Sequence, residues 1–138
     1  MAEQVYAKQL SQSEIDAHAS ILEYQDGTDI QHDIIKYLNE RMENELAWLD
    51  TLERSDIPAT IIWGELDAVA PVAVPDDVWA KYLTNRDTPA TYWRIPCADH
   101  YLQVDEPELI VDILHTTLAN GLFPSEIEGA NCQAVRTH

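Results

Sequence analysis

The chain has 138 residues, the size of one domain, and 46% of them are hydrophobic, which is enough to bury a core. Eight basic against 25 acidic residues give a formal net charge of −17, and so acidic a surface repels nucleic-acid phosphates and anionic lipid. No apolar run approaches the roughly 20 residues of a membrane span, and the first residues lack a signal-peptide pattern. The sequence therefore predicts a single-domain cytoplasmic protein without nucleic-acid or membrane partners.

The N-terminal part, residues 10–56, has helical patterns. Ser11 and Thr28 each begin a capping box, because a Glu or a Gln follows three residues later. Behind the second box, apolar side chains recur at three- and four-residue steps, at Ile30, Ile34, Leu38, Met42, Leu46, Leu49 and Leu52. We expect this helix to end near Arg54, since Pro58 forbids much more.

The next part, residues 57–120, alternates strands and helices. The apolar runs Ala59–Trp63 and Thr91–Ile95 read as buried strands, and proline with flanking acids at Pro75 and Pro107 is typical of helix starts. A strand–helix–strand unit of this size implies a parallel pair with a right-handed crossover. The predicted fold is α/β: N-terminal helices plus a small parallel sheet flanked by helices.

The last segment, residues 121–138, contains two glycines and a proline but few large apolar residues, which predicts a loose or partner-dependent tail. Cys97 and Cys132 are the only cysteines, and in a cytoplasmic protein two free thiols are expected. The outer edge of Ala59–Trp63 lacks a partner in the sequence, and the chain is too short to cover both that edge and the apolar helix stripe. We therefore predict a homodimer or larger homo-oligomer.

Each predicted strand is followed by a titratable side chain. Asp67 comes three residues after Gly64, which stops the first strand, and His100 follows the second. An acid and a histidine thus stand near the ends of two strands. Asp99 is the alternative acid, but adjacent side chains in an extended loop point apart, so Asp67 is favoured.

These segments resemble a known family. Residues 61–67 (IIWGELD), followed by Pro71, are similar to the acid-bearing segment of α/β-hydrolases, Gly-x-x-Asp-x-x-x-Pro. Residues 95–108 (IPCADHYLQVDEPE) resemble the histidine segment of that family. The helices before the first strand resemble the end of the cap in haloalkane dehalogenases and epoxide hydrolases. The resemblance covers roughly residues 10–120, and it implies that Asp67 orients the ring of His100, the general base.

The same family needs a nucleophile elbow, Gly-x-(Ser/Asp/Cys)-x-Gly, and no two of the four glycines have that spacing. Cys97 is an alternative nucleophile near His100, but no elbow supports it and a small residue at a strand end is the simpler interpretation. The resemblance therefore implies the C-terminal half of such an enzyme, beginning inside the cap.

Three functional interpretations follow. The first is a truncated, non-catalytic α/β-hydrolase-like oligomer that binds a small apolar ligand or a protein. The second is half of a split hydrolase for ester, epoxide or carbon–halogen bonds, completed by a complementary N-terminal half. The third is a hydrolase whose nucleophile comes across a subunit interface. Trp48, Trp63 and Tyr101 are candidate ligand contacts, with core packing as the alternative for Trp63. No zinc-ligand spacing or phosphate-binding glycine loop is present, so no cofactor is expected.

Overall fold

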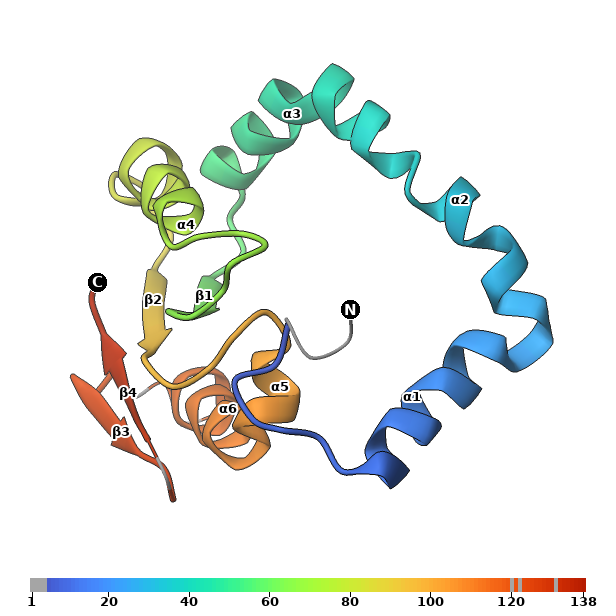
Figure 1. Ribbon diagram of the computed structural model, residues 1–138. Helices are drawn as coiled ribbons and strands as arrows, with labels where there is room; N and C mark the ends of the chain where they lie inside the picture. The colour runs from blue at the N-terminus through green and yellow to red at the C-terminus, as the bar shows by residue number, and fades with distance from the viewer. Residues whose placement is uncertain (1–4, 120, 122, 131) are drawn as a thin grey trace.

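The computed structural model describes residues 5–119, 121, 123–130 and 132–138. An arch of helices leads into a small sheet with helices on both faces (Figure 1), which agrees with the predicted α/β class in general. None of the helices in the described residues is both long and apolar enough to cross a bilayer. In chain order the elements are α1 (Gln12–Glu23), the 3₁₀ segment η2 (Tyr24–Ile30), α2 (Gln31–Ile34), α3 (Tyr37–Arg54), β1 (Ala59–Gly64), α4 (Ala73–Val78), the π-helical turn η3 (Trp79–Leu83), β2 (Ala90–Ile95), α5 (Leu102–Asp105), α6 (Pro107–Leu114), the π-helical turn η4 (His115–Ala119), β3 (Glu126–Glu128) and β4 (Gln133–Arg136).

The sheet has four strands in the order β1-β2-β4-β3. β1 and β2 are parallel, from Ala59 opposite Ala90 to Gly64 opposite Ile95, which confirms the predicted pairing. β4 runs antiparallel to both β2 and β3, so the sheet is mixed and not purely parallel as predicted. The outer edge of β1 has no strand beside it among the described residues.

The C-terminal segment corrects a prediction, because residues 121–138 contain a β-hairpin where a loose tail was expected. Its strands are short, and backbone hydrogen bonds hold it to β2: the amide of Tyr92 donates to the carbonyl of His138, and the amide of Thr137 donates to the carbonyl of Tyr92 (3.0 and 2.9 Å). Ala134 is fully buried. Backbone pairing needs no run of large apolar residues, so the composition of the segment did not indicate it.

The two cysteines correct a second prediction. Cys97 and Cys132 form a disulfide, with their Cα atoms 6.1 Å apart, where two free thiols were expected. The bridge joins the loop after β2 to the segment between β3 and β4. The expectation of free thiols assumed a cytoplasmic location and a tail that does not return to the sheet, and the return of the hairpin brings Cys132 beside Cys97.

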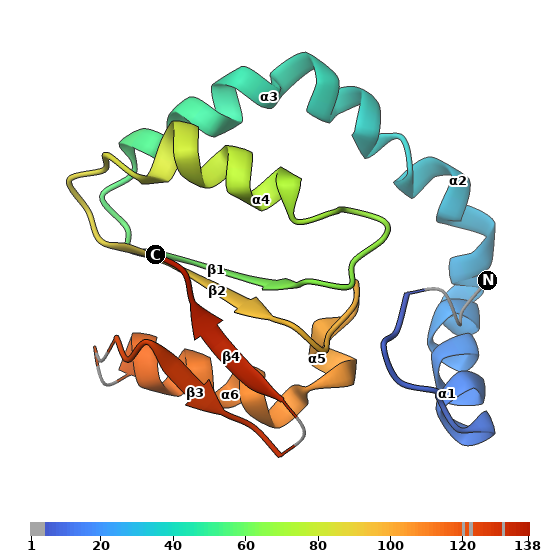
Figure 2. The ribbon, with the colours of Figure 1, turned by 60° about the vertical axis from the view of Figure 1, so that its left-hand side comes forward.

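Two apolar clusters lie on opposite faces of the sheet. Tyr92 and Trp93 are neighbours on β2 and point to opposite sides, as strand geometry requires. Tyr92 packs with Trp79 and Leu83 under α4 and η3. The larger cluster, under α6, consists of Trp93, Ile95, Ala98, Leu109, Ile113 and Ala134. Figure 2 shows α4 and α6 on the two sides of the β1–β2 pair.

The N-terminal helices follow the prediction in part. The Ser11 capping box is present: the Glu14 amide donates to Ser11 Oγ and the Ser11 amide donates to the Glu14 carboxylate (3.3 and 2.7 Å). The second box is absent, because the Gln31 side chain donates to the Gly27 carbonyl and residues 24–30 form 3₁₀ turns. The predicted long helix is therefore interrupted, and α3 begins only at residue 37; it ends at Arg54 as expected.

Candidate active site

The loops that follow β1 and β2 are in direct contact, and Gly64 makes this contact possible. A Cβ atom at Gly64 would lie 2.4 Å from the carbonyl oxygen of Ala98 and 2.5 Å from that of Asp99, closer than real Cβ contacts. Two backbone bonds join the loops there, from the amide of Glu65 to the carbonyl of Ile95 and from that of Leu66 to that of Ala98, both 3.0 Å. The glycine that stops the strand thus also sets the spacing of the two loops.

The carboxylate of Asp67 is held in place by its own loop. Its Oδ1 accepts the amides of Val69 and Ala70 at 2.9 and 2.7 Å, and the residue is only 7% exposed. The indole of Trp63 donates to the carbonyl of Ala70 at 2.9 Å, which fixes the far side of the loop. These bonds use Oδ1 and leave Oδ2 for another donor.

That donor is the ring of His100. The Nδ1 atom of His100 lies 3.0 Å from Oδ2 of Asp67, so the structure brings the two predicted residues together. The side chain of His100 is 35% exposed, whereas that of Asp67 is 5% exposed. Asp99, the alternative acid, instead accepts the backbone amide of His100 at 2.6 Å.

The arrangement fixes which ring nitrogen can act. An ionised carboxylate only accepts hydrogen bonds, so the proton of a neutral His100 ring belongs on Nδ1. The lone pair is then on Nε2, the atom that faces away from Asp67. Such a ring can take a proton from a hydroxyl, a thiol or water, and the buried carboxylate stabilises the imidazolium that results.

A nucleophile is missing from this geometry. Within the described part of the chain, no serine, threonine or cysteine side chain hydrogen-bonds to the ring of His100. Cys97, the alternative weighed from the sequence, is only three residues from His100, but its sulfur is in the disulfide. Among the residues that the structure describes, the pair is therefore a carboxylate and an imidazole with no hydroxyl or thiol bonded to the ring.

The three aromatic residues predicted to contact a ligand lie in different surroundings. Trp48 lines a cavity of about 730 Å³ between α3 and α4, together with Leu46, Leu49, Val74, Val78 and Tyr82. Trp63 packs against the buried Trp79, Leu83 and Tyr92. Tyr101 lies edge-on to His100, with ring centroids 5.2 Å apart. The structure therefore brings Tyr101 to the ring of His100 and Trp63 to the loop of Asp67, whereas Trp48 lines the separate cavity.

One residue of the site was not singled out from the sequence. Asp105, at the end of α5, is 9% exposed, and its carboxylate accepts the amides of Asp99 (2.9 Å), Ala7 (3.0 Å to each oxygen) and Lys8 (3.3 Å). In the sequence it is one of three acids around Pro107 and reads as part of a helix start. Only its position five residues after His100 distinguishes it, and that spacing has no meaning until the loop is folded.

A second polar cluster lies beside the acid loop, where β2 faces α4. The guanidinium of Arg94 forms an ion pair with Asp76, and the hydroxyl of Tyr92 donates to the same carboxylate at 3.0 Å. The hydrogen bond from Arg94 is the main cause that lowers the pKa of Asp76, and the same bond raises the pKa of Arg94. Burial raises the pKa of the Tyr92 hydroxyl. Because Arg94 also lies 3.9 Å from Glu65, this cluster supports the first turn of the acid loop.

Comparison with curated proteins gives one kind of relative. The chain is similar to a protein named "Putative hydrolase LipZ" from Mycobacterium tuberculosis, in strains CDC 1551 / Oshkosh and ATCC 25618 / H37Rv, with 31% identity over 102 residues in each case. The match covers 74% of this chain and 34% of the relative, so the chain spans about a third of the length of the curated relatives it matches. No family model matches the chain. No solved structure matches it either.

Proposed function

We propose that this chain is the acid- and histidine-bearing part of an α/β-hydrolase-like protein, in which Asp67 orients His100 and His100 is the general base. The observation that carries the proposal is the 3.0 Å contact between Asp67 Oδ2 and His100 Nδ1, made at the carboxyl ends of two adjacent parallel strands. The similarity to the protein named "Putative hydrolase LipZ" over 74% of the chain supports the hydrolase-like part of the proposal.

In this proposal the chain alone does not catalyse, and the nucleophile comes from a complementary hydrolase segment. The alternative is a nucleophile that a second copy of this chain supplies across a subunit interface. With a hydroxyl or thiol nucleophile, His100 Nε2 would take its proton as it attacks an ester carbonyl and would give that proton to the leaving alcohol, while Asp67 stabilises the imidazolium in between. A carboxylate nucleophile has no proton to give: it would open an epoxide or displace a halide directly, and His100 would take the proton of the water that hydrolyses the resulting ester. The side chain of His100 is 35% exposed, so a partner can reach part of its surface.

The uncovered surfaces of the chain support the idea of a partner. Met42 and Leu46 on α3 are 81% and 78% exposed, and Ile34 and Leu38 are 52% and 41% exposed. Together with the unpaired outer edge of β1, they form an apolar helix face and a strand edge of the kind that other chains pair with. We propose a homo-oligomer, with a complementary hydrolase half as the alternative partner.

The cavity at Trp48 supports a further part of the proposal, the binding of a small apolar ligand. Its apolar lining comes from α3, α4 and η3, and the charged side chains that also line it are paired, Arg41 with Glu45 (3.4 Å) and Lys81 with Asp77 (2.7 Å). Paired charges compete weakly for a charged ligand, which favours an uncharged one.

The location of the protein belongs to the proposal as well. The sequence favours the cytoplasm, whereas a disulfide is typical of an oxidising compartment. The two locations are distinguished by alkylating free thiols in intact source cells and measuring the mass of the protein by mass spectrometry. In a reducing cytoplasm both cysteines are alkylated, whereas in an oxidising compartment the disulfide protects them from alkylation.

The test of the proposed function uses the full chain, pure and then co-purified from its source cells. We expect ester, epoxide and haloalkane turnover by the pure chain at the rate of buffer. Turnover in the co-purified assembly should be lost in His100→Ala and kept in His32→Ala, a matched change at an exposed histidine on α2. Turnover by the pure chain that rises with the square of its concentration and needs His100 would favour the subunit-interface version. Turnover in either sample that is indifferent to His100→Ala would overturn the assignment.

A further inference from the structure

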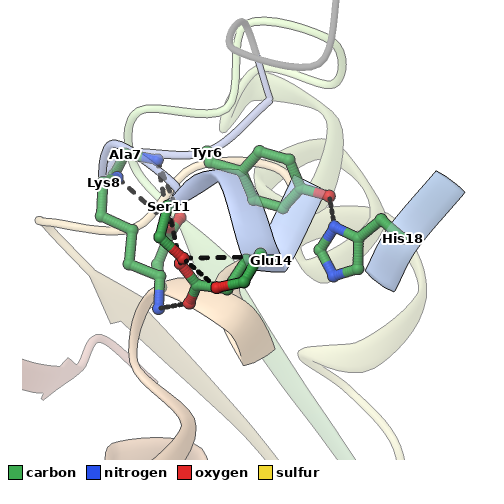
Figure 3. A network of polar contacts seen from close by, with 8 residues as sticks. Tyr6, Ala7, Lys8, Ser11, Glu14 and His18 are labelled. Carbon is green, nitrogen blue, oxygen red and sulfur yellow. Dashed lines mark hydrogen bonds and ion pairs between the residues drawn. The ribbon is translucent and has the colours of Figure 1, made fainter. Parts of the chain in front are cut away.

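The carboxylate of Asp105 connects two segments that are far apart in the sequence. One oxygen accepts the amide of Asp99, in the loop that carries His100, at 2.9 Å. The two oxygens together accept the amides of Ala7 and Lys8, about 98 residues earlier in the chain. Figure 3 shows the N-terminal side of this network, with Ala7 and Lys8 beside Ser11 and Glu14, and with Tyr6 directed at His18.

A short series of bonds runs from Asp105 to the catalytic pair. Asp105 fixes the amide of Asp99, and the carboxylate of Asp99 accepts the amide of His100 at 2.6 Å. The ring of His100 then reaches Oδ2 of Asp67. Because the first two bonds are to backbone amides, they determine the direction in which the loop presents the histidine side chain. Hydrogen bonds to an ionised carboxylate are also about twice as strong as neutral ones.

The N-terminal segment, residues 5–8, depends on the same carboxylate. Its other contacts to the loop are the Val5 carbonyl, which accepts the amide of Tyr101 at 3.1 Å, and the ring of Tyr6, which stacks on Tyr101 with centroids 5.1 Å apart. The hydroxyl of Tyr6 is 3.1 Å from Nδ1 of His18, which joins the segment to α1. Tyr101 in turn lies edge-on to His100.

We propose that Asp105 is a positioning residue for His100 and that its carboxylate couples the docking of residues 5–8 to the orientation of the histidine ring. This inference rests on the proposed function, since His100 needs positioning only if its ring is used. The physical reason is that one buried carboxylate serves amides from both segments. When either segment leaves, the carboxylate loses partners that water does not fully replace, and the other segment is held less firmly.

The test is nuclear magnetic resonance of the full-length, ¹⁵N-labelled chain, comparing Asp105→Asn with Asp112→Asn. Asp112 is exposed on α6, so the control makes the same chemical change outside the network. In the wild type and in Asp112→Asn we expect the ring of His100 in one neutral tautomer, with the proton on Nδ1. In Asp105→Asn we expect a mixture of tautomers, and amide exchange at Ala7, Lys8 and Asp99 at least about tenfold faster, from the loss of charge-assisted bonds. A folded Asp105→Asn with a single tautomer would overturn the inference.

A second measurement is made on the wild type, so it stands even when Asp105→Asn does not fold. If the bonds to the carboxylate of Asp105 break in one event, the amides of Ala7 and Asp99 become exposed to solvent together. Their hydrogen-exchange protection factors should then agree within about threefold. Protection factors that differ by more than about a hundredfold would show that the two segments open separately, and the coupling would be wrong. Neither result depends on hydrolysis. The absence of turnover in the assembly co-purified from source cells would count against the proposed function. A single His100 tautomer in the wild type and a mixture in Asp105→Asn would leave this inference standing in that case.

Discussion

Removing the Cys97–Cys132 disulfide should destabilise the fold by about 4 kcal/mol at most. The bridge closes a loop with a sequence separation of 35 residues. In the chain-entropy description, freeing a loop of that length raises the entropy of the unfolded chain by an amount worth about 3.8 kcal/mol at 25 °C. Both cysteines are half-buried, so changing them to serine should add little for lost packing.

The loss should leave the acid–histidine pair in place. The contacts of the loop after β2 with Gly64, Leu66 and Asp105 do not involve the sulfur atoms. We therefore expect lower stability with an unchanged histidine environment.

The assay is urea unfolding of the oxidised wild type beside the Cys97→Ser/Cys132→Ser double variant, with the reduced wild type as the control for the serine side chains. The free energy of unfolding of the double variant and of the reduced protein should both be about 2–4 kcal/mol lower than that of the oxidised protein. A difference below about 0.5 kcal/mol, or two thiols free to alkylation in the native protein under oxidising conditions, would refute the reasoning.

Three other outcomes are expected. Gly64→Ala should lower the free energy of unfolding by about 2–3 kcal/mol or more, because the new methyl group would lie 2.4 Å from the carbonyl oxygen of Ala98. Thermal unfolding measures this loss. A variant as stable as the wild type would mean that the two loops can move apart without a loss of stability. Since Arg94 lowers the pKa of Asp76 in the folded state, the stabilisation from this pair is complete above the unfolded pKa of roughly 3.9 and is lost as the pH falls through the folded value. The urea midpoint should accordingly fall less between pH 5 and pH 2 in Asp76→Asn than in the wild type, and equal falls would contradict the shift. An uncharged apolar ligand that enters the cavity beside α3 should quench tryptophan fluorescence in the wild type but much less in Trp48→Phe, and equal quenching would place the ligand elsewhere.

The strand pair and the approach of Asp67 to His100 could be predicted because local sequence signals coincide there. The run Ala59–Trp63 is apolar and β-branched, and Gly64 ends it at the point where the loops must touch. The acid follows after a fixed number of residues, so the position of Asp67 depends only on the end of the strand. The position of His100 likewise depends on the end of β2. Because β1 and β2 are parallel neighbours, their carboxyl ends lie at the same edge of the sheet, which brings the two side chains together.

The remainder depends on contacts between distant segments, which leave little trace in the sequence. The β3–β4 hairpin joins the sheet through backbone bonds and one fully buried alanine, Ala134, rather than through an apolar run. The pairing of Cys97 with Cys132 follows from that hairpin. Left-handed backbone at Gln25 and Asp26 separates α1 from the turns that follow it. The break before α3 is a turn at Ile35 and Lys36, whose backbone stays in the right-handed helical region, so neither residue type marks it in the sequence.

The site and the uncovered surfaces are separate parts of the molecule, and this bears on how a partner would act. The contacts that set the Asp67–His100 geometry all lie in the loops after β1 and β2, in α5 and in residues 5–8. The exposed apolar residues of α3 make none of these contacts, and the outer edge of β1 lies opposite the edge that pairs with β2. A partner that covers α3 or extends the sheet at β1 would therefore meet an acid–histidine pair that is already formed. Its contribution would be a nucleophile brought to Nε2, and not a rearrangement of the pair.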